Sequence, residues 1–167
     1  MASSPSSSSF RPLVCVVDFH HARGPEISHW FGAAAGTDPT AANDWHLIPY
    51  MALPDGAHQL DEEFSYFSLV RKEGDNRSTA AGGGGGGDGE NSEEATSVFG
   101  ISCCRSIAAA ELKWKGEEVT RSAVQKAVVV ITDRPQSFGA LREKLAVVTR
   151  AWFAQRDFRE MEILQVG

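Results

Sequence analysis

The run AVQKAVVVIT, residues 123–132, constrains the fold of this chain more than any other segment. Six of its ten residues are β-branched, and β-branched side chains favour a pleated strand over a helix. Shorter β-rich or alternating runs are centred on Val16, Ile27, Tyr66 and Ile101. The sequence therefore predicts an antiparallel sheet of about five strands with at least one covered face.

Helical signals accompany these strands. Over residues 137–155, apolar residues recur at spacings of three and four, which predicts one amphipathic helix that packs through a single stripe. The stripe consists of Phe138, Leu141, Leu145, Val148 and Trp152. A shorter helix is expected in WHLIPYMAL, residues 45–53, with Asp44 as its N-cap and Pro49 in its first turn. Asp157 is expected to begin a further helix. These helices, together with the antiparallel strands, predict the α+β fold class.

Alternation along the second strand assigns its faces. In the segment EISHWF, the residues Ile27, His29 and Phe31 alternate with Ser28 and Trp30. Because successive strand residues point to opposite sides of a sheet, we expect the first three to share one face.

Two segments are expected to lie outside the packed domain. Residues 1–12 are serine-rich and are expected to be disordered. An insertion at residues 72–96 contains six consecutive glycines, and packing cannot offset the entropy lost on ordering them. A phosphate-binding loop is not expected there, because no Gly-Lys-Ser/Thr leads into a helix. The length of 167 residues otherwise suits one domain with a core of its own.

The charge and cysteine content exclude several classes of protein. A net charge of −6 argues against a nucleic-acid partner, because phosphate binding needs a basic surface. Three cysteines without regular spacing do not make a disulfide framework, which favours a reducing compartment. We found neither a secretory signal nor an apolar segment long enough to span a bilayer. The sequence therefore predicts a cytoplasmic protein.

The candidate chemical residues do not combine into an active site. His20 and His21 are adjacent on a predicted strand, so they are expected to point to opposite faces and not to share one metal ion. The same alternation applies to Cys103 and Cys104, for which no neighbouring base is evident. Pro-Asp-Gly at residues 54–56 has the composition of a turn. We therefore expect no catalytic, metal-binding or cofactor-binding residue, and an interaction module rather than a metal- or thiol-dependent enzyme.

Several segments, taken in order, resemble one family. They are VVDFHHARGPEI, LIPYMALPDGAH, VFGISCCRSI, EVTRSAVQKAVVVIT and LREKLAVVTRAWFAQRDF. Together they resemble the N-terminal part of the Avl-type late secretory pathway proteins, a branch of the DENN-domain family. Asp18 departs from the glycine that is usual in this family. The matching motif residues, for which structural roles are expected, are Phe19, His20, His21, Gly24, Pro54, Asp55, Gly56, His58, Phe99, Gly100, Ile101, Arg121, Ser122, Gln125 and Lys126.

The resemblance implies a fold and a function. Residues 13–167 are expected to form an upstream DENN module, which is longin-like, without the central DENN module. DENN proteins act on Rab GTPases as guanine-nucleotide exchange factors, so this chain is expected to supply half of such a clamp, on or near Golgi-derived or secretory vesicles. Contacts are expected at the exposed edge of the sheet and around FHHARG. The alternative is a longin-like trafficking scaffold whose binding is independent of nucleotide.

Overall fold

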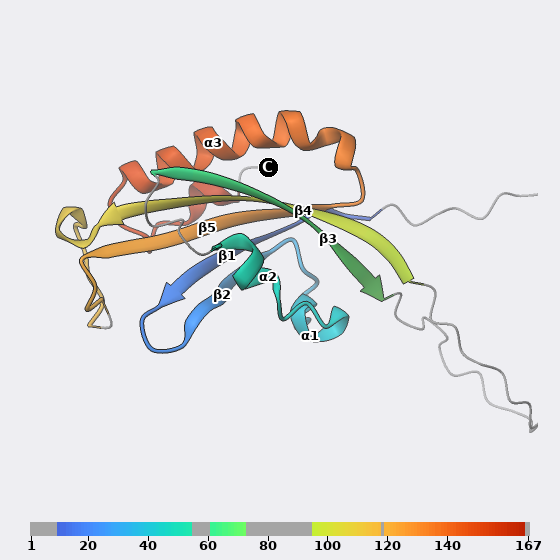
Figure 1. Ribbon diagram of the computed structural model, residues 1–167, viewed down its shortest axis with the longest axis horizontal. Helices are drawn as coiled ribbons and strands as arrows, with labels where there is room; N and C mark the ends of the chain where they lie inside the picture. The colour runs from blue at the N-terminus through green and yellow to red at the C-terminus, as the bar shows by residue number, and fades with distance from the viewer. Residues whose placement is uncertain (1–9, 55–60, 73–94, 118, 166–167) are drawn as a thin grey trace, which may run out of the picture.

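Five antiparallel strands form one sheet in the computed structural model (Figure 1). The structure describes residues 10–54, 61–72, 95–117 and 119–165. The strands are β1 (Leu13–His20), β2 (Gly24–Phe31), β3 (Glu62–Lys72), β4 (Ala95–Ala108) and β5 (Ala123–Thr132), and their order in the sheet is β2-β1-β5-β4-β3. The predicted number of strands is confirmed, and β5 has the bounds that its β-branched run predicts.

Helices cover both faces of this sheet (Figure 1). The long helix α3 (Phe138–Ala154) packs on one face, and two short helices, α1 (Pro39–Asn43) and α2 (Ile48–Ala52), lie on the other. Three short 3-10 turns complete the described structure, at Ala109–Glu111, Pro135–Ser137 and Glu162–Leu164. The result is the predicted α+β, longin-like architecture, with a separate hydrophobic core on each side of the sheet.

The core beneath α3 is built from the predicted stripe. Leu145 and Trp152 are buried, and the other three stripe residues pack around them. Trp152 packs edge-on against Phe153 and Phe158, and its indole N–H donates to the carbonyl of Glu160 at 3.0 Å. These contacts fix the segment after α3 against the helix that precedes it.

The segment after α3 is not the further helix that Asp157 was expected to begin. The Asp157 carboxylate instead accepts the backbone N–H and the guanidinium of Arg159, two residues on. The bond to the backbone N–H has the form of a helix N-cap, but the residues after it form turns and not an α-helix. Only a 3-10 turn, Glu162–Leu164, forms before the end of the described residues.

The opposite core contains α2, and here one predicted cap is wrong. Pro49 lies in the first turn as predicted, but Leu47 occupies the N-cap position without a side-chain hydrogen bond. Asp44 instead ends α1 with a left-handed backbone. The start of α1 is favoured because Asp38 accepts the N–H of Thr40 at 3.0 Å and Pro39 occupies the first helical turn, which needs no N–H.

Side chains of the sheet hold α2 in place. The hydroxyl of Ser65 donates to the Met51 carbonyl at 2.7 Å, and that of Ser102 donates to the Ala52 carbonyl at 3.0 Å. Carbonyls at a helix C-terminus lack partners within the helix. The two serines supply partners at the point where this short helix meets the sheet.

The faces of β2 differ from the simple alternation. Val16 pairs with His29 while Val17 pairs with Ile27, so Ser28 is an extra, bulged residue. A β-bulge shifts the side-chain alternation by one residue. Ile27 consequently packs on the α2 side of the sheet and Phe31 on the α3 side, and the prediction that they share a face is wrong.

The two segments expected to be disordered are described only at their ends. Phe10, within residues 1–12, packs against the core on the α2 side and lies beneath the Arg71 guanidinium at 5.1 Å. Lys72 pairs with Ala95, so β3 and β4 extend into both ends of the insertion predicted at residues 72–96. The remainder of both segments lies outside the described residues, where the prediction of disorder stays a prediction. None of the described helices has the length and apolar character needed to cross a membrane.

Candidate functional site

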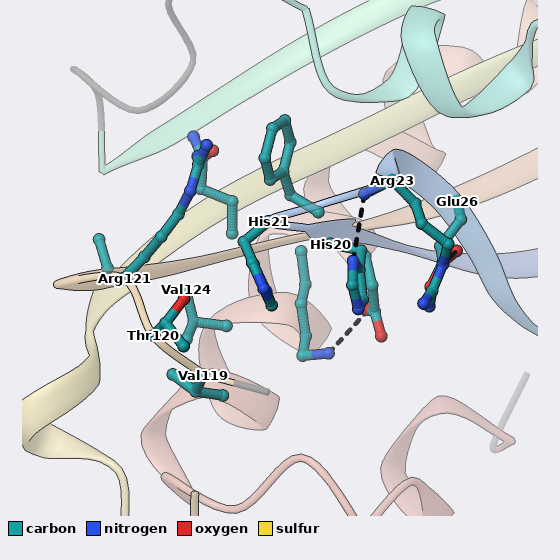
Figure 2. A pocket seen from close by; sticks show the side chains of 13 residues that line it. His20, His21, Arg23, Glu26, Val119, Thr120, Arg121 and Val124 are labelled. Atoms are coloured by element: carbon teal, nitrogen blue, oxygen red, sulfur yellow. Dashed lines mark hydrogen bonds and ion pairs between the residues drawn. The ribbon is translucent and has the colours of Figure 1, made fainter. Parts of the chain in front are cut away.

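A pocket of about 130 Å³ lies at the end of the sheet where β1 turns into β2 (Figure 2). We call it the turn pocket. Its other wall is the segment that leads into β5, because β1 and β5 are neighbours in the sheet. Six of the family-motif residues line it: Phe19, His20, His21, Arg121, Gln125 and Lys126. The structure thus brings together two motifs that are about a hundred residues apart in the chain.

The histidine pair shapes the turn itself. His20 ends β1, and its Nδ1 accepts the backbone N–H groups of Ala22 at 3.1 Å and Arg23 at 3.2 Å. A neutral His20 ring therefore carries its proton on Nε2. The ring of His21 stacks on that of His20, with 4.7 Å between the ring centroids.

The expected opposite orientation of these two histidines is wrong. Alternation of side chains requires both residues to be in an extended strand, but β1 ends at His20 and His21 lies in the turn. Because His20 Nδ1 already accepts two backbone N–H groups, its lone pair is not free to bind a metal ion. No group of three His, Cys, Asp or Glu side chains within the described ranges could hold a metal ion.

Ion pairs involve both carboxylates that line the turn pocket. Asp18 lies 2.7 Å from the Lys126 ammonium, and these two residues are directly paired in the β1–β5 register. Glu26 accepts two hydrogen bonds from the Arg23 guanidinium, at 2.6 and 2.8 Å, and these lower the pKa of its carboxyl. Asp18, which departs from the family pattern, thus has a specific partner in β5.

Arg121 has a different environment from the other cations of the pocket. Its guanidinium lies over the Phe19 ring, 4.4 Å from the ring centroid, in a cation–π contact. The side chain is exposed and has no ion pair with a described residue. A planar guanidinium in this position can still form hydrogen bonds to a partner. Arg121 and His21 are both exposed, so they present two polar side chains to solvent at this end of the sheet (Figure 2).

All three cysteines are remote from this chemistry. Cys103 packs in the core beneath α3 and Cys104 in the core on the α2 side, which confirms that they point to opposite faces. Burial raises the pKa of Cys15 and of Cys103, and raises that of Cys104 to about 12. A thiol nucleophile must be ionised, so these buried thiols are poorly suited to catalysis.

The other motif residues are not part of the turn pocket. Gly24 adopts a φ of +84° where the β1–β2 turn enters β2, a conformation that favours glycine. The carbonyl of Ser122 accepts the Ala109 N–H at 2.8 Å. Pro54 follows α2, whereas Asp55, Gly56 and His58 lie outside the described residues. The turn expected at residues 54–56 stays a prediction.

The motif residues Phe99, Gly100 and Ile101 lie within β4, remote from the β1–β2 turn. Gly100 pairs with Phe67 of the neighbouring strand. A Cβ atom added at Gly100 would lie 2.2 Å from an atom of the Phe67 ring, which is far closer than atoms pack. Glycine at this position therefore allows the aromatic ring to cover the backbone of β4.

Replacing Gly100 by Ala is expected to lower the free energy of unfolding by about 1–3 kcal/mol, because the Phe67 ring must move to admit a methyl group. Denaturant unfolding measures this change. Gly139→Ala is the matched control, since nothing lies within 4 Å of a Cβ there. Combining Gly100→Ala with Phe67→Leu should show a favourable coupling. Equal effects at Gly100 and Gly139 would contradict the packing described.

The motif set did not include several residues of the turn pocket, namely Asp18, Glu26 and Thr120, whereas Arg23 lies within the segment FHHARG, where contacts are expected. A signal for one pair was present, because Arg23 and Glu26 are opposite charges that flank Gly-Pro. The pairing of Asp18 with Lys126 could be found only from the register of two strands distant in sequence.

The described structure is thus a longin-like α+β domain with an exposed pocket formed by two chain segments and with buried thiols. The family model described as "Transport protein Avl9" matches residues 12–166. The chain belongs to this Avl9 family of transport proteins, which confirms the resemblance of its motifs.

Two curated relatives support this assignment. The chain is 45% identical over 152 residues to the late secretory pathway protein AVL9 of Saccharomyces cerevisiae, an alignment that covers 91% of the chain and 19% of the yeast protein. It is 38% identical over 161 residues to late secretory pathway protein avl9 of Schizosaccharomyces pombe, covering 96% of the chain and 29% of that protein. The chain therefore spans less than a third of either relative. No solved structure matches it significantly.

Proposed function

We propose that this chain is part of a regulator of vesicle traffic in the late secretory pathway. Support comes from its membership of the Avl9 family and from the two relatives, both named for that pathway. Peripheral association with Golgi-derived or secretory vesicles, through partner proteins and from the cytoplasmic side, belongs to the same proposal.

Within that role, the chain contacts a Rab-type GTPase as one half of a DENN-type guanine-nucleotide exchange clamp. The turn pocket carries this proposal, because it offers exposed recognition groups on a well-braced turn and no activated nucleophile. Nucleotide exchange needs no acid–base pair: a protein that binds the nucleotide-free GTPase more tightly than the loaded form shifts the equilibrium towards release. A binding surface is therefore sufficient for the activity.

The specific contacts in this proposal are Arg121 and His21. Both side chains are exposed, and each is supported by an aromatic neighbour, Phe19 beneath Arg121 and His20 against His21. Side chains held in place before binding lose less conformational entropy at an interface. Arginine is also enriched among the residues that dominate binding energy at interfaces.

The test is a capture experiment with a panel of Rab GTPases, each one loaded with GDP, loaded with a GTP analogue, or stripped of nucleotide. We expect selective capture of one GTPase in its stripped or GDP-bound state. Equal capture in every state would instead support the nucleotide-independent trafficking scaffold. Absence of capture in every state would contradict a GTPase contact by this chain.

Two arginine variants test whether the GTPase contact involves the turn pocket. Arg121→Ala should reduce capture, while Arg134→Ala serves as the matched control. Arg134 is an exposed arginine that follows β5 at the opposite end of that strand. Equal loss with both variants would indicate a general charge effect rather than a specific site.

A further inference from the structure

An exposed tryptophan lies in the connection between β4 and β5. Trp114 lies between two lysines in the sequence, Lys113 and Lys115, and all three residues are exposed. We call these residues the Trp114 tip. Trp114 is 47% exposed, whereas Trp45 and Trp152 are almost completely buried. The turn pocket does not explain why a large aromatic side chain is this exposed in a loop.

The Trp114 tip is held in one position by the segment after α3. The backbone N–H of Lys113 donates to the Arg156 carbonyl at 2.9 Å. The Arg159 guanidinium lies over the Trp114 ring, 4.6 Å from its centroid. Arg159 is itself fixed by two side-chain hydrogen bonds to Asp157, at 2.6 and 2.9 Å. The indole is therefore presented by a braced loop and carries a third cation against its ring.

We propose that the Trp114 tip, together with Arg159, binds the anionic headgroups of a membrane surface. Tryptophan is enriched at the interface between lipid and water, where its apolar ring and polar N–H are both satisfied. Lysine and arginine beside it attract anionic lipids, each worth about 1 kcal/mol near the surface. The tip thus combines an interfacial aromatic group with the two lysine ammonium groups, while Arg159 is ion-paired with Asp157.

Acidic residues limit the strength of this binding. Asp157 is ion-paired with Arg159. Glu111 and Glu117 lie in the same connection as Trp114, and Glu160 follows Arg159. The whole chain also carries a net charge of −6. Attraction therefore depends on the cations closest to the indole and not on the overall field of the protein. The contact is expected to be weak and sensitive to salt, because exposed charges are screened over about 10 Å at 0.1 M ionic strength.

A lipid surface suits the tip better than an acidic protein does. A stable protein interface buries a cluster of large side chains over about 800 Å² on each partner. The other large hydrophobic side chains that are strongly exposed in the described chain lie on or beside α2, on β3 and on α3, as Leu47, Tyr50, Tyr66, Val70 and Val147. A bilayer interface accepts a single aromatic ring without such a cluster.

This inference does not depend on the GTPase contact. The proposed function places the chain at vesicles through its partners, whereas the Trp114 tip would contact lipid directly. Experiments can therefore contradict the lipid contact while the GTPase contact stands, or the reverse. Trp114→Ala should retain GTPase capture while losing lipid binding, and Arg121→Ala should do the reverse.

Tryptophan fluorescence with unilamellar vesicles tests the proposal, since Trp114 is the most exposed tryptophan among the described residues. With phosphatidylcholine vesicles that contain an increasing fraction of phosphatidylserine, we expect a blue shift and protection from an aqueous quencher. Trp114→Ala should abolish both changes. Lys113→Ala and Lys115→Ala should each weaken binding roughly five-fold, and added salt should weaken it further. Tyr50→Ala is the matched control, because it removes an exposed aromatic side chain from α2 and should bind as wild type does.

Three results would overturn the proposal. The first is equal binding to vesicles with and without phosphatidylserine. The second is wild-type binding by Trp114→Ala, measured by co-sedimentation. The third is binding of soluble polyglutamate that protects Trp114 from the quencher as fully as anionic vesicles do, which would assign the tip to an acidic protein partner.

Discussion

Trp152→Ala is expected to lower the free energy of unfolding by about 3–5 kcal/mol. Trp152 is fully buried at the centre of the core beneath α3. Its removal leaves a cavity between α3 and the sheet, and takes away the aromatic contacts with Phe153 and Phe158. It also leaves the Glu160 carbonyl without its indole donor. Denaturant unfolding followed by circular dichroism measures the change.

Val147→Ala is the matched control for this experiment. Val147 lies on the same helix but is 64% exposed, and surface substitutions of this kind change stability by about 0.5 kcal/mol or less. Similar effects at both positions would show that the apolar stripe of α3 does not face the sheet as described.

Leu145→Ala is expected to cost about 2–5 kcal/mol for the same physical reason. Leu145 is 5% exposed, lies in the middle of α3, and belongs to the core that includes Ile101 and Cys103 of β4. Alanine preserves the helix, so the loss reports packing rather than helix propensity. Thermal unfolding of Leu145→Ala and of Lys144→Ala, an exposed neighbour, separates the two effects. A melting temperature equal to that of wild type would contradict the placement of Leu145.

The elements with strong periodic patterns were predictable from sequence. The apolar stripe of α3 encodes one buried helix face, and the β-branched run of β5 encodes one strand. Both elements lie where the sequence predicts them. Local interactions decided the errors. Asp38 caps the start of α1 with Pro39 in its first turn, which leaves Asp44 to end this helix. Asp157 accepts the Arg159 N–H in a similar way, but turns and a 3-10 helix follow it rather than an α-helix. These outcomes depend on competition among nearby polar groups.

The bulge in β2 and the turn pocket could not be found from local patterns. The bulge at Ser28 depends on the register between β1 and β2, and it inverts the faces of the residues around it. The turn pocket depends on strand order: β5 lies beside β1, and this places Lys126 and Arg121 against the β1–β2 turn. The motifs supplied the residue types, but only the sheet topology brings them together.

Calorimetric titration of the captured Rab GTPase into this chain measures directly whether the turn pocket recognises the nucleotide state of the GTPase. The GTPase would be used both stripped of nucleotide and loaded with a GTP analogue, against wild type, Arg121→Ala and Arg134→Ala. We expect tighter binding of the stripped form, weaker binding by Arg121→Ala and unchanged binding by Arg134→Ala. Equal affinity for both forms of the GTPase, unaffected by Arg121→Ala, would contradict a GTPase-recognition role for the turn pocket.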